Sequence, residues 1–337
     1  MKILLIIITL FQFCFTFGQT FGVTNKNIEL DIKELIKPAT KVELTHAVKY
    51  KGEFYCFFEE VKKDNLSRDI KFCFVFSDTS KNLKKIEVPT AIQNTVYYDL
   101  FVKDDKVFVK TYMDSETFCF DIHKSKWVKK KNAADLIFED EKFYVYSLDF
   151  GEWGGKTWFK DKKTELEYEI EVTTPLVNKI ETTYYLTKSN KVLKIENPLT
   201  LNKCNNEVTY ENIEKDAKYS SWYGKQIGFE IVYKDTTTRD YFDYSYRPYI
   251  VSSFVWQNEL LHIYETDTVT YIAKTENNKI KTIQKIGNKL SFYDWHYSYR
   301  SKIQTDGRQL LKFKTNNKFG LIEINGLDIN TYNLILK

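Results

Sequence analysis

Lys51-Gly-Glu-Phe-Tyr-Cys-Phe-Phe58 starts with a turn-forming pair and continues as strand-forming, mostly aromatic residues. Six further stretches follow the same template, a polar cluster and then mainly apolar residues, and they begin at Asp105, Glu141, Glu181, Gly224, Asn258 and Gly307. Consecutive starts lie 54, 36, 40, 43, 34 and 49 residues apart, with a mean near 43. Because aromatic and β-branched residues fit the pleated surface of a sheet, each stretch predicts a short strand that follows a turn.

A sheet-forming unit that recurs about every 40–45 residues has the spacing of β-propeller blades. The sequence therefore predicts an all-β fold made of a single β-propeller. Seven blades are the expectation, and the unequal spacing leaves six or eight blades open. Only five prolines and twelve glycines occur in 337 residues, without a low-complexity linker. This favours one continuous propeller domain over residues 20–337.

Closure of such a ring commonly uses a strand from one terminus to complete the blade built by the other. Val42–Leu44 near the start, and Leu321–Ile324 or Tyr332–Leu336 at the end, are the candidates for that closure. Ile28–Pro38 is the best helical candidate because apolar residues recur through it and proline stops it. Its first half alternates equally well as a strand, so both alternatives stay open.

The first 19 residues have the pattern of a secretory signal peptide. Met1-Lys2 is followed by an apolar run from Ile3 to Phe17 and then by Gly18-Gln19. The run is shorter than the roughly 20 apolar residues that a spanning helix needs. Phe13 before Cys14 is too bulky for a lipoprotein signal. We therefore expect a cleaved leader over 1–19, a mature chain without a transmembrane segment, and a periplasmic or secreted location.

The charges exclude a nucleic-acid partner. The 50 basic and 46 acidic residues give a formal net charge of +4, and the two signs are mixed along the chain. Nucleic-acid binding domains show a concentrated basic patch instead. Aromatic residues make up 16% of the chain, with 24 Tyr and 25 Phe, which again favours strands.

Four cysteines remain after the leader: Cys56, Cys73, Cys119 and Cys204. Cys56 and Cys73 lie in two apolar runs that could be the arms of one hairpin, and in an exported protein they could form a disulfide. The alternative is that both are buried thiols that pack as small apolar groups. None of the four has the spacing of a zinc site, so no metal site and no cofactor is predicted.

Asp149-Phe-Gly-Glu-Trp-Gly-Gly-Lys-Thr-Trp158 is the most motif-like stretch. Its latter half resembles the Asp-box of sialidase-type propellers, Ser-x-Asp-x-Gly-x-Thr-Trp. Gly155, Thr157 and Trp158 match that pattern, whereas Gly151 and Trp153 stand where Ser and Asp should be. The resemblance implies a turn within a propeller blade and no catalytic role. Trp153 is the residue of this stretch that could contact a ligand.

A second feature is the repeat of Tyr-Ser-Tyr-Arg at 244–247 and 297–300, 53 residues apart. If both copies lead into equivalent strands of successive blades, they lie on one face of the ring, where tyrosines can stack on ligands and arginines can bind carboxylates. The predicted binding residues are Tyr244, Tyr246, Arg247, Trp295, His296, Tyr297, Tyr299 and Arg300, with Trp153. The alternative is that these tyrosines fill the space between blades.

No stretch concentrates a nucleophile, a base and an orienting group, so an enzyme is less expected than a binding protein. We expect a monomeric, exported propeller that binds a glycan, a peptide or a protein. One alternative is a propeller-type polysaccharide hydrolase or lyase. Another is an inhibitor or immunity-type partner of a second exported protein.

Overall fold

The computed structural model describes residues 20–32, 35–37, 41–61, 70–78, 83–95, 97–111, 116–130, 136–149, 155–173, 176–204, 226–236, 248–292, 307–315 and 318–337. Strands make up 68% of these residues and helices 3%, which confirms the all-β prediction. The predicted leader lies outside the described residues. Within them, no helix is long and apolar enough to cross a membrane.

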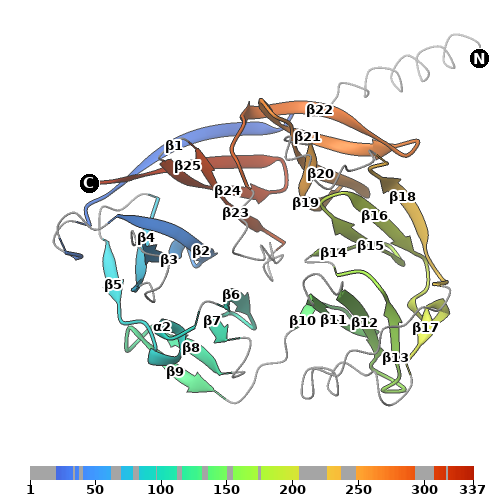
Figure 1. The fold of residues 1–337 in the computed structure, drawn as a ribbon, viewed down its shortest axis with the longest axis horizontal. Coiled ribbons are helices and arrows are strands. Elements are labelled where there is room, and N and C mark those ends of the chain that lie inside the picture. Colours follow the sequence, from blue (N-terminus) through green and yellow to red (C-terminus); the bar gives the residue numbers. More distant parts are fainter. Residues whose placement is uncertain are drawn as a thin grey trace, which may run out of the picture.

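Six sheets surround a common axis and form a β-propeller (Figure 1). Blade 1, from the axis outward, contains β2 (Val42–Tyr50), β3 (Glu53–Glu60), β4 (Lys71–Ser77) and β5 (Lys84–Ile86). Blade 2 contains β6 (Tyr98–Lys103), β7 (Lys106–Thr111), β8 (Thr117–Asp121) and β9 (Lys126–Lys130), and the short helix α2 (Thr90–Gln93) precedes it. Blade 3 contains β10 (Leu136–Glu139), β11 (Phe143–Asp149), β12 (Gly155–Asp161), β13 (Glu167–Ile170) and β17 (Asn202–Lys203).

The other three blades complete the ring. Blade 4 contains β14 (Leu176–Ile180), β15 (Thr183–Lys188), β16 (Lys191–Ile195) and β18 (Glu230–Lys234), and a 3-10 turn, Pro198–Thr200, follows β16. Blade 5 contains β19 (Tyr249–Trp256), β20 (Glu259–Glu265), β21 (Val269–Glu276) and β22 (Lys279–Asn288). Blade 6 contains β23 (Gln309–Thr315), β24 (Lys318–Asn325), β25 (Asp328–Leu336) and, outermost, β1 (Gly22–Leu30).

The blade number is therefore six, the smaller of the two alternatives to the expected seven. The fifth stretch of the sequence template, which starts at Gly224, does not begin a blade. Its last two residues, Glu230 and Ile231, begin β18, and Ile231 pairs with Leu193 as part of the fourth strand of blade 4. The template marks any strand after a polar cluster, so an outer strand satisfies it as well as an inner one does.

Two-residue turns explain why the template recurs. Lys51-Gly52, Asp104-Asp105 and Gln257-Asn258 join the first two strands of blades 1, 2 and 5, and all six residues have positive φ. Such left-handed pairs match the twist of a hairpin and favour Gly, Asn and Asp. In blades 1, 2 and 5 the polar start of the stretch is thus the turn, and the apolar residues after it are the second strand. The stretch that starts at Gly307 leads instead into β23, the first strand of blade 6.

The apolar run of β3 reflects burial on both faces of the blade. Phe54, Cys56 and Phe58 pack in the core between blades 1 and 6, whereas Tyr55 and Phe57 pack in the core between blades 1 and 2. All five side chains are 1% exposed or less. A strand that lies between two neighbouring sheets is apolar at successive positions rather than at alternate ones.

The same geometry rules out the predicted disulfide. Cys56 pairs across the sheet with Phe74, and Cys73 pairs with Phe57. Direct partners share a face and successive residues alternate, so the two thiols point to opposite faces of blade 1. Both are free and buried, in agreement with the alternative of buried thiols, and burial raises the pKa of each well above its usual value.

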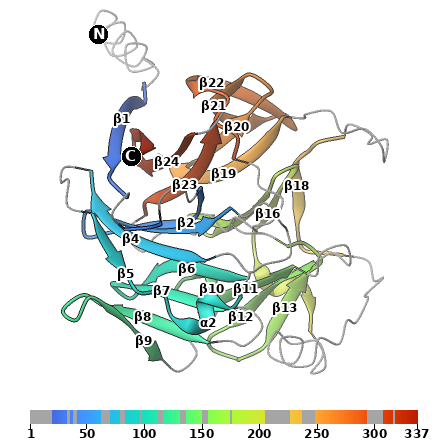
Figure 2. The same cartoon turned by 60° about the vertical axis from the view of Figure 1, so that its left-hand side comes forward.

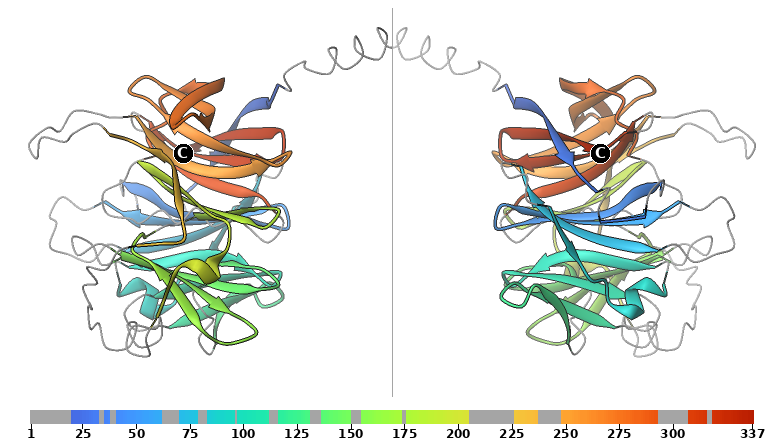
Figure 3. Two further views of the ribbon diagram at one scale, coloured as in Figure 1. Left: turned by 90° about the vertical axis from the view of Figure 1, so that its right-hand side faces the viewer. Right: turned by 90° about the vertical axis from the view of Figure 1, so that its left-hand side faces the viewer.

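We call the face of the ring at which β2 and β6 begin the front face, and the other the rear face. Thr45 near the start of β2 meets Tyr98 at the start of β6. Tyr50, which ends β2, donates to the carbonyl of Asp105 just beyond β6. The two innermost strands therefore run in the same direction, from front to rear. Figure 3, at right angles to Figure 1, shows strands that cross the depth of the ring.

Blade 6 is reversed relative to its neighbours. Lys314, at the end of β23, pairs with Glu43 near the start of β2, whereas Lys49 near the end of β2 bonds to Glu323. Glu323 lies opposite Leu310, near the start of β23. The innermost strand of blade 6 thus runs antiparallel to that of blade 1, from rear to front.

The contact with blade 5 agrees with this reversal. Trp256, at the end of β19, packs against Gly326. Gly326 follows the end of β24, and that end pairs with the start of β23 through Gln309 and Ile324. The end of β19 and the start of β23 therefore lie on the same face, so these two innermost strands are also antiparallel.

The ring is closed by β1, which joins the reversed blade 6 as its outermost strand. β1 pairs with β25 in parallel, from Gly22 opposite Asp328 to Leu30 opposite Leu336, and lies along the outer side of blade 6 (Figure 2). The predicted segment Tyr332–Leu336 belongs to β25, the partner in this closure, but Val42–Leu44 begins β2 instead of closing the ring. Ile28 belongs to β1, which is the strand alternative, and residues 31–32 and 35–37 contain no helix.

Candidate functional site

Three innermost strands carry a β-bulge near their first residues. The pairing register shifts between Leu44 and His46 in β2, between Leu136 and Phe138 in β10, and between Ile250 and Ser252 in β19. A bulge adds one residue to a strand and turns a side chain away from the regular alternation. The recurrence of the bulge in blades 1, 3 and 5 identifies a repeated feature of the inner wall.

In blade 1 this bulge is the junction of three blades. The Thr45 hydroxyl donates to the carbonyl of Phe57 (3.1 Å) and lies 2.7 Å from the hydroxyl of Tyr98 in blade 2. The carbonyl of the preceding Leu44 accepts from Nζ of Lys312 in blade 6 (2.8 Å). The extra residue of β2 thus fixes how blades 6, 1 and 2 meet at the front face.

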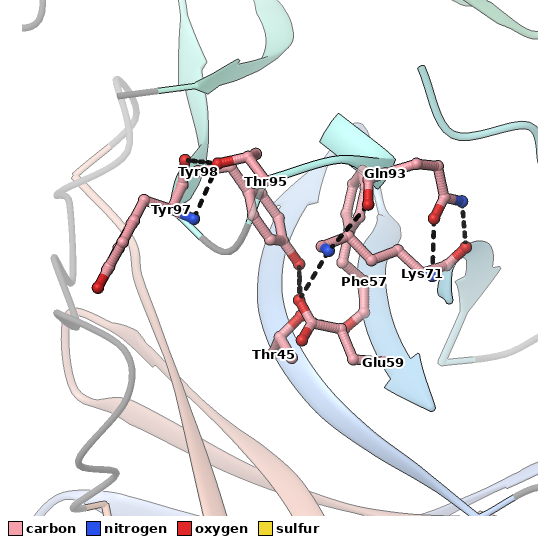
Figure 4. Close-up of polar contacts among 8 residues, drawn as sticks. All are labelled: Thr45, Phe57, Glu59, Lys71, Gln93, Thr95, Tyr97 and Tyr98. Atoms are coloured by element: carbon pink, nitrogen blue, oxygen red, sulfur yellow. Dashed lines mark hydrogen bonds and ion pairs between the residues drawn. The ribbon is translucent and has the colours of Figure 1, made fainter. Parts of the chain in front are cut away.

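A buried ion pair lies beside Thr45. Glu59 and Lys71 have side chains that are 6% and 2% exposed, and their charged atoms are 3.8 Å apart. Tyr98 donates to Oε1 of Glu59 (3.1 Å), as Figure 4 shows. Lys71 Nζ also donates to the main-chain carbonyl of Gln93 (3.5 Å). These added contacts compensate for the removal of both charges from water.

The Gln93 side chain replaces a missing strand partner at the start of β4. Its Nε2 donates to the carbonyl of Lys71 (2.7 Å), and its Oε1 accepts from the amide of the same residue (2.9 Å). Gln93 ends α2, so this helix is fastened to blade 1 immediately before the chain enters blade 2. The chain is therefore fixed to blade 1 both before β6, through Gln93, and at its first residue, through the bond from Tyr98 to Glu59.

Tyr97 stands at this fixed position with its side chain in solvent. It is 53% exposed, and its ring points away from the Glu59–Lys71 pair (Figure 4). The hydroxyl of Thr95 donates to the carbonyl of Tyr97 (3.2 Å) and accepts from its amide (3.1 Å). The carbonyl and the amide of an exposed aromatic residue are thus both bonded to one hydroxyl, at the front end of an innermost strand.

Other buried charges are likewise paired within the protein. Lys49 bonds to Glu323 (2.9 Å) between blades 1 and 6, and Lys156 bonds to both carboxylate oxygens of Glu169 (3.0 Å each) in blade 3. On the rear side, burial would raise the pKa of Asp140, but hydrogen bonds from Lys179 and Tyr184 outweigh burial and hold this pKa below its usual value. These pairs support the scaffold.

We find no candidate metal site in the described part of the chain. No group of three or more His, Cys, Asp or Glu residues there could hold a metal ion. At the junction of blades 6, 1 and 2, Tyr97 is exposed to solvent, whereas Thr45, Tyr98, Glu59 and Lys71 are buried.

The sequence-predicted site residues, Trp153, Tyr244, Tyr246, Arg247, Trp295, His296, Tyr297, Tyr299 and Arg300, all lie outside the described residues. One premise of that prediction does not hold. The two Tyr-Ser-Tyr-Arg segments precede β19 and β23, and these strands begin on opposite faces of the ring because blade 6 is reversed. The positions of β19 and β23 therefore do not support the prediction that the two Tyr-Ser-Tyr-Arg segments lie on one face.

The Asp-box-like residues have packing roles. Thr157 donates to the carbonyl of Val172 (2.6 Å), and Trp158 is completely buried. A Cβ on Gly155 would lie 1.7 Å from the Thr173 hydroxyl, so only glycine fits there. A Thr-aromatic pair also lies at or next to the start of the third strands of blades 2 and 5, at Thr117-Phe118 and Thr270-Tyr271. The resemblance thus marks a general feature of these blades.

Sequence reasoning missed Tyr97 and the ion pair below it. Glu59 and Lys71 flank a polar loop, which is the usual context of solvated charges. Tyr97-Tyr98 is one of two adjacent tyrosine pairs in the chain, with Tyr184-Tyr185. The only available signal was alternation, because successive residues of a strand point to opposite sides and one tyrosine of the pair must therefore leave the core.

No protein-family model matches the chain, and no curated protein matches it. Among solved structures, a family 117 glycoside hydrolase of the marine bacterium Zobellia galactanivorans shares 7% identity over 88% of this chain and 86% of its own, with a TM-score of 0.33. The extracellular domain of a protein described as a hybrid two-component system from B. thetaiotaomicron shares 7% identity over 91% of this chain and 46% of its own, with a TM-score of 0.29. The WD40 domain of SCAP from fission yeast shares 12% identity over 86% of this chain and 72% of its own, with a TM-score of 0.16.

Proposed function

We propose that the protein is an exported, monomeric binding module that recognises a glycan on the front face of its propeller. The observation that carries the proposal is Tyr97, an aromatic side chain that is 53% exposed on a main chain fixed by Thr95. Thr95 fixes the main chain of Tyr97, so the exposed ring starts from a defined position at the front end of β6.

Rigidity is what makes this residue suited to recognition. A contact group that is already held in its bound position loses little conformational entropy when the ligand arrives. Thr95 holds the main chain of Tyr97, and the neighbouring Tyr98 is held by its hydrogen bond to Glu59. Loops and strand ends on a rigid scaffold commonly carry function for this reason.

A glycan fits this surface better than a charged ligand does. The flat face of a tyrosine packs against the C–H face of a sugar ring, and its hydroxyl can hydrogen-bond. The charges of the Glu59–Lys71 pair, close to Tyr97 in the fold, are buried and engaged with each other. A charged ligand would have to compete with this pair.

Binding is preferred to polysaccharide hydrolysis because of how the carboxylates are used. Glycosidases need two accessible carboxyl groups about 5–10 Å apart. Glu59, Glu169 and Glu323 are buried, and each bonds to a lysine. Hydrolysis, and inhibition of a second exported protein, remain the alternatives that the experiment below separates from binding.

The test is a binding screen of the mature chain from Thr20 onward against laminarin, xylan, alginate and pectin, followed by thermal unfolding. A ligand at 100 times its dissociation constant adds about 2.7 kcal/mol to the free energy of unfolding, which raises the melting temperature measurably. For the polysaccharide that binds, we expect Tyr97→Ala to weaken affinity at least about tenfold and Tyr97→Phe to retain most of it.

Ile122→Ala is the matched control. Ile122 is 44% exposed and belongs to the turn between β8 and β9, on the rear side of the same blade, so its removal should leave affinity unchanged. Equal weakening by both alanine variants contradicts a front-face site. Release of reducing sugar from the bound polysaccharide favours the hydrolase, and a silent panel with capture of one exported protein favours the inhibitor.

A further inference from the structure

His262 lies in a row of side chains that crosses blade 5. Strand pairing places Ser253 of β19 on one side of it and Ala273 of β21 on the other. The imidazole is completely buried, and the Ser253 hydroxyl oxygen lies 2.6 Å from Nδ1. The second ring nitrogen, Nε2, is buried without a hydrogen-bond partner among the residues that the structure describes.

This nitrogen keeps an unused hydrogen-bonding capacity at neutral pH. Burial lowers the pKa of His262 to about 4, so the ring is neutral at pH 7. A neutral imidazole has one donor and one acceptor nitrogen, whichever tautomer is present. Since Ser253 engages Nδ1 alone, Nε2 is left as a donor or an acceptor, and protein interiors rarely leave such groups unsatisfied.

The surroundings define the size and charge of a partner. Leu260 and Tyr264 flank His262 on the same side of β20 and pack against Val192 and Tyr233 of blade 4. Ala273, the direct neighbour across the sheet, presents only a methyl group. An apolar wall disfavours a charged partner because of the cost of removing charge from water, so a partner of Nε2 must be uncharged and small.

We propose that the seam between blades 4 and 5 binds one water molecule at Nε2 of His262. Buried waters occur where polar groups lack protein partners, and they are costly to remove. This site adjoins a polar network, because the carbonyl of Ser253 accepts from Asn178 of blade 4 (3.3 Å) and from Gln309 of blade 6 (2.6 Å). The water extends a set of contacts that joins three consecutive blades at their innermost strands.

An experimental structure of the unmodified protein with ordered solvent tests the site directly. We expect a water oxygen within hydrogen-bond distance of His262 Nε2, about 2.7–3.2 Å. A structure in which Nε2 bonds to a protein group, or touches apolar atoms alone, overturns the proposal.

Two variants of equal shape test it in solution. Ala273→Thr and Ala273→Val both add two heavy atoms beside His262, but only threonine supplies a hydroxyl that can replace the displaced water. We expect the threonine variant to melt at least about 2 °C above the valine variant. Equal melting temperatures, or a more stable valine variant, count against a polar partner at this position. If neither variant folds, the structure of the unmodified protein decides.

Discussion

His262 couples folding to acidity through a single side chain. The folded protein holds its pKa near 4, against 6.5 for an unperturbed histidine, and the cause is burial. Between these values the unfolded chain binds a proton that the folded protein excludes. Stability from this residue is therefore complete above pH 6.5 and is lost as the pH falls towards 4, at up to about 1.4 kcal/mol per pH unit.

The variant His262→Gln tests this. Glutamine can still hydrogen-bond to Ser253 but does not titrate, so urea unfolding should show a shallower loss of stability between pH 6.5 and 4 than in the unmodified protein. Above pH 7 the difference between the two proteins should be constant. Parallel curves across the whole range mean that His262 does not contribute.

At the scale of single elements, β24 depends on a glycine. A Cβ at Gly320 would lie 2.1 Å from the Phe313 ring and 2.5 Å from the carbonyl of Tyr332. We predict that Gly320→Ala lowers the free energy of unfolding by about 1–3 kcal/mol, because the neighbouring strands must move apart.

Gly287→Ala is the matched control for this prediction. Gly287 also lies in a strand, β22, but a Cβ there meets no atom within 4 Å. Urea unfolding of the two variants should therefore show a loss for Gly320→Ala only. Similar losses at both positions show that glycine acts through backbone flexibility rather than through close packing.

Elements differ in how far the sequence predicts them. The second strands and the turns before them follow directly from residues such as Lys51-Gly52 and Asn258, because turn chemistry is local. The strand β18 and the parallel strand β1 do not, since their roles depend on which distant strand they pair with. Glu230-Ile231 of β18 has the same local pattern as an inner strand.

The candidate site was less predictable still. Its residues come from several elements, and the contact between Thr45 and Tyr98 exists because a bulge turns one side chain out of register. No residue type around Thr45 marks this bulge in the sequence. The burial of Glu59 with Lys71 depends on the neighbouring blade, so no local pattern reveals it.

At the scale of the whole molecule, β1 links three blades. Phe21 packs in the core between blades 5 and 6, and Gln284 of β22 bonds to both the amide and the carbonyl of Phe21 (2.8 Å each). Ile28 and Leu30 pack in the core between blades 6 and 1. The intervening side chains are mostly exposed, so ring closure rests on the two ends of one strand.

We therefore predict that Phe21→Ala destabilises the protein by about 3–5 kcal/mol, with a lowered melting temperature as the readout. Val23 lies two residues further along and is only partly buried, so Val23→Ala should reduce the free energy of unfolding far less. Equal effects would mean that β1 is held by its backbone ladder alone.

The parallel pairing of β1 with β25 also decides how the molecule can be tethered. Gly22 and Asp328 share one end of this pair, and Leu30 and Leu336 share the other. The chain leaves Leu30 and enters β2 at the front, so the chain before Gly22 departs from the rear and Lys337 lies at the front. A bead, sensor chip or fusion partner attached ahead of Thr20 leaves Tyr97 open to solution, whereas attachment through Lys337 crowds the face that carries it.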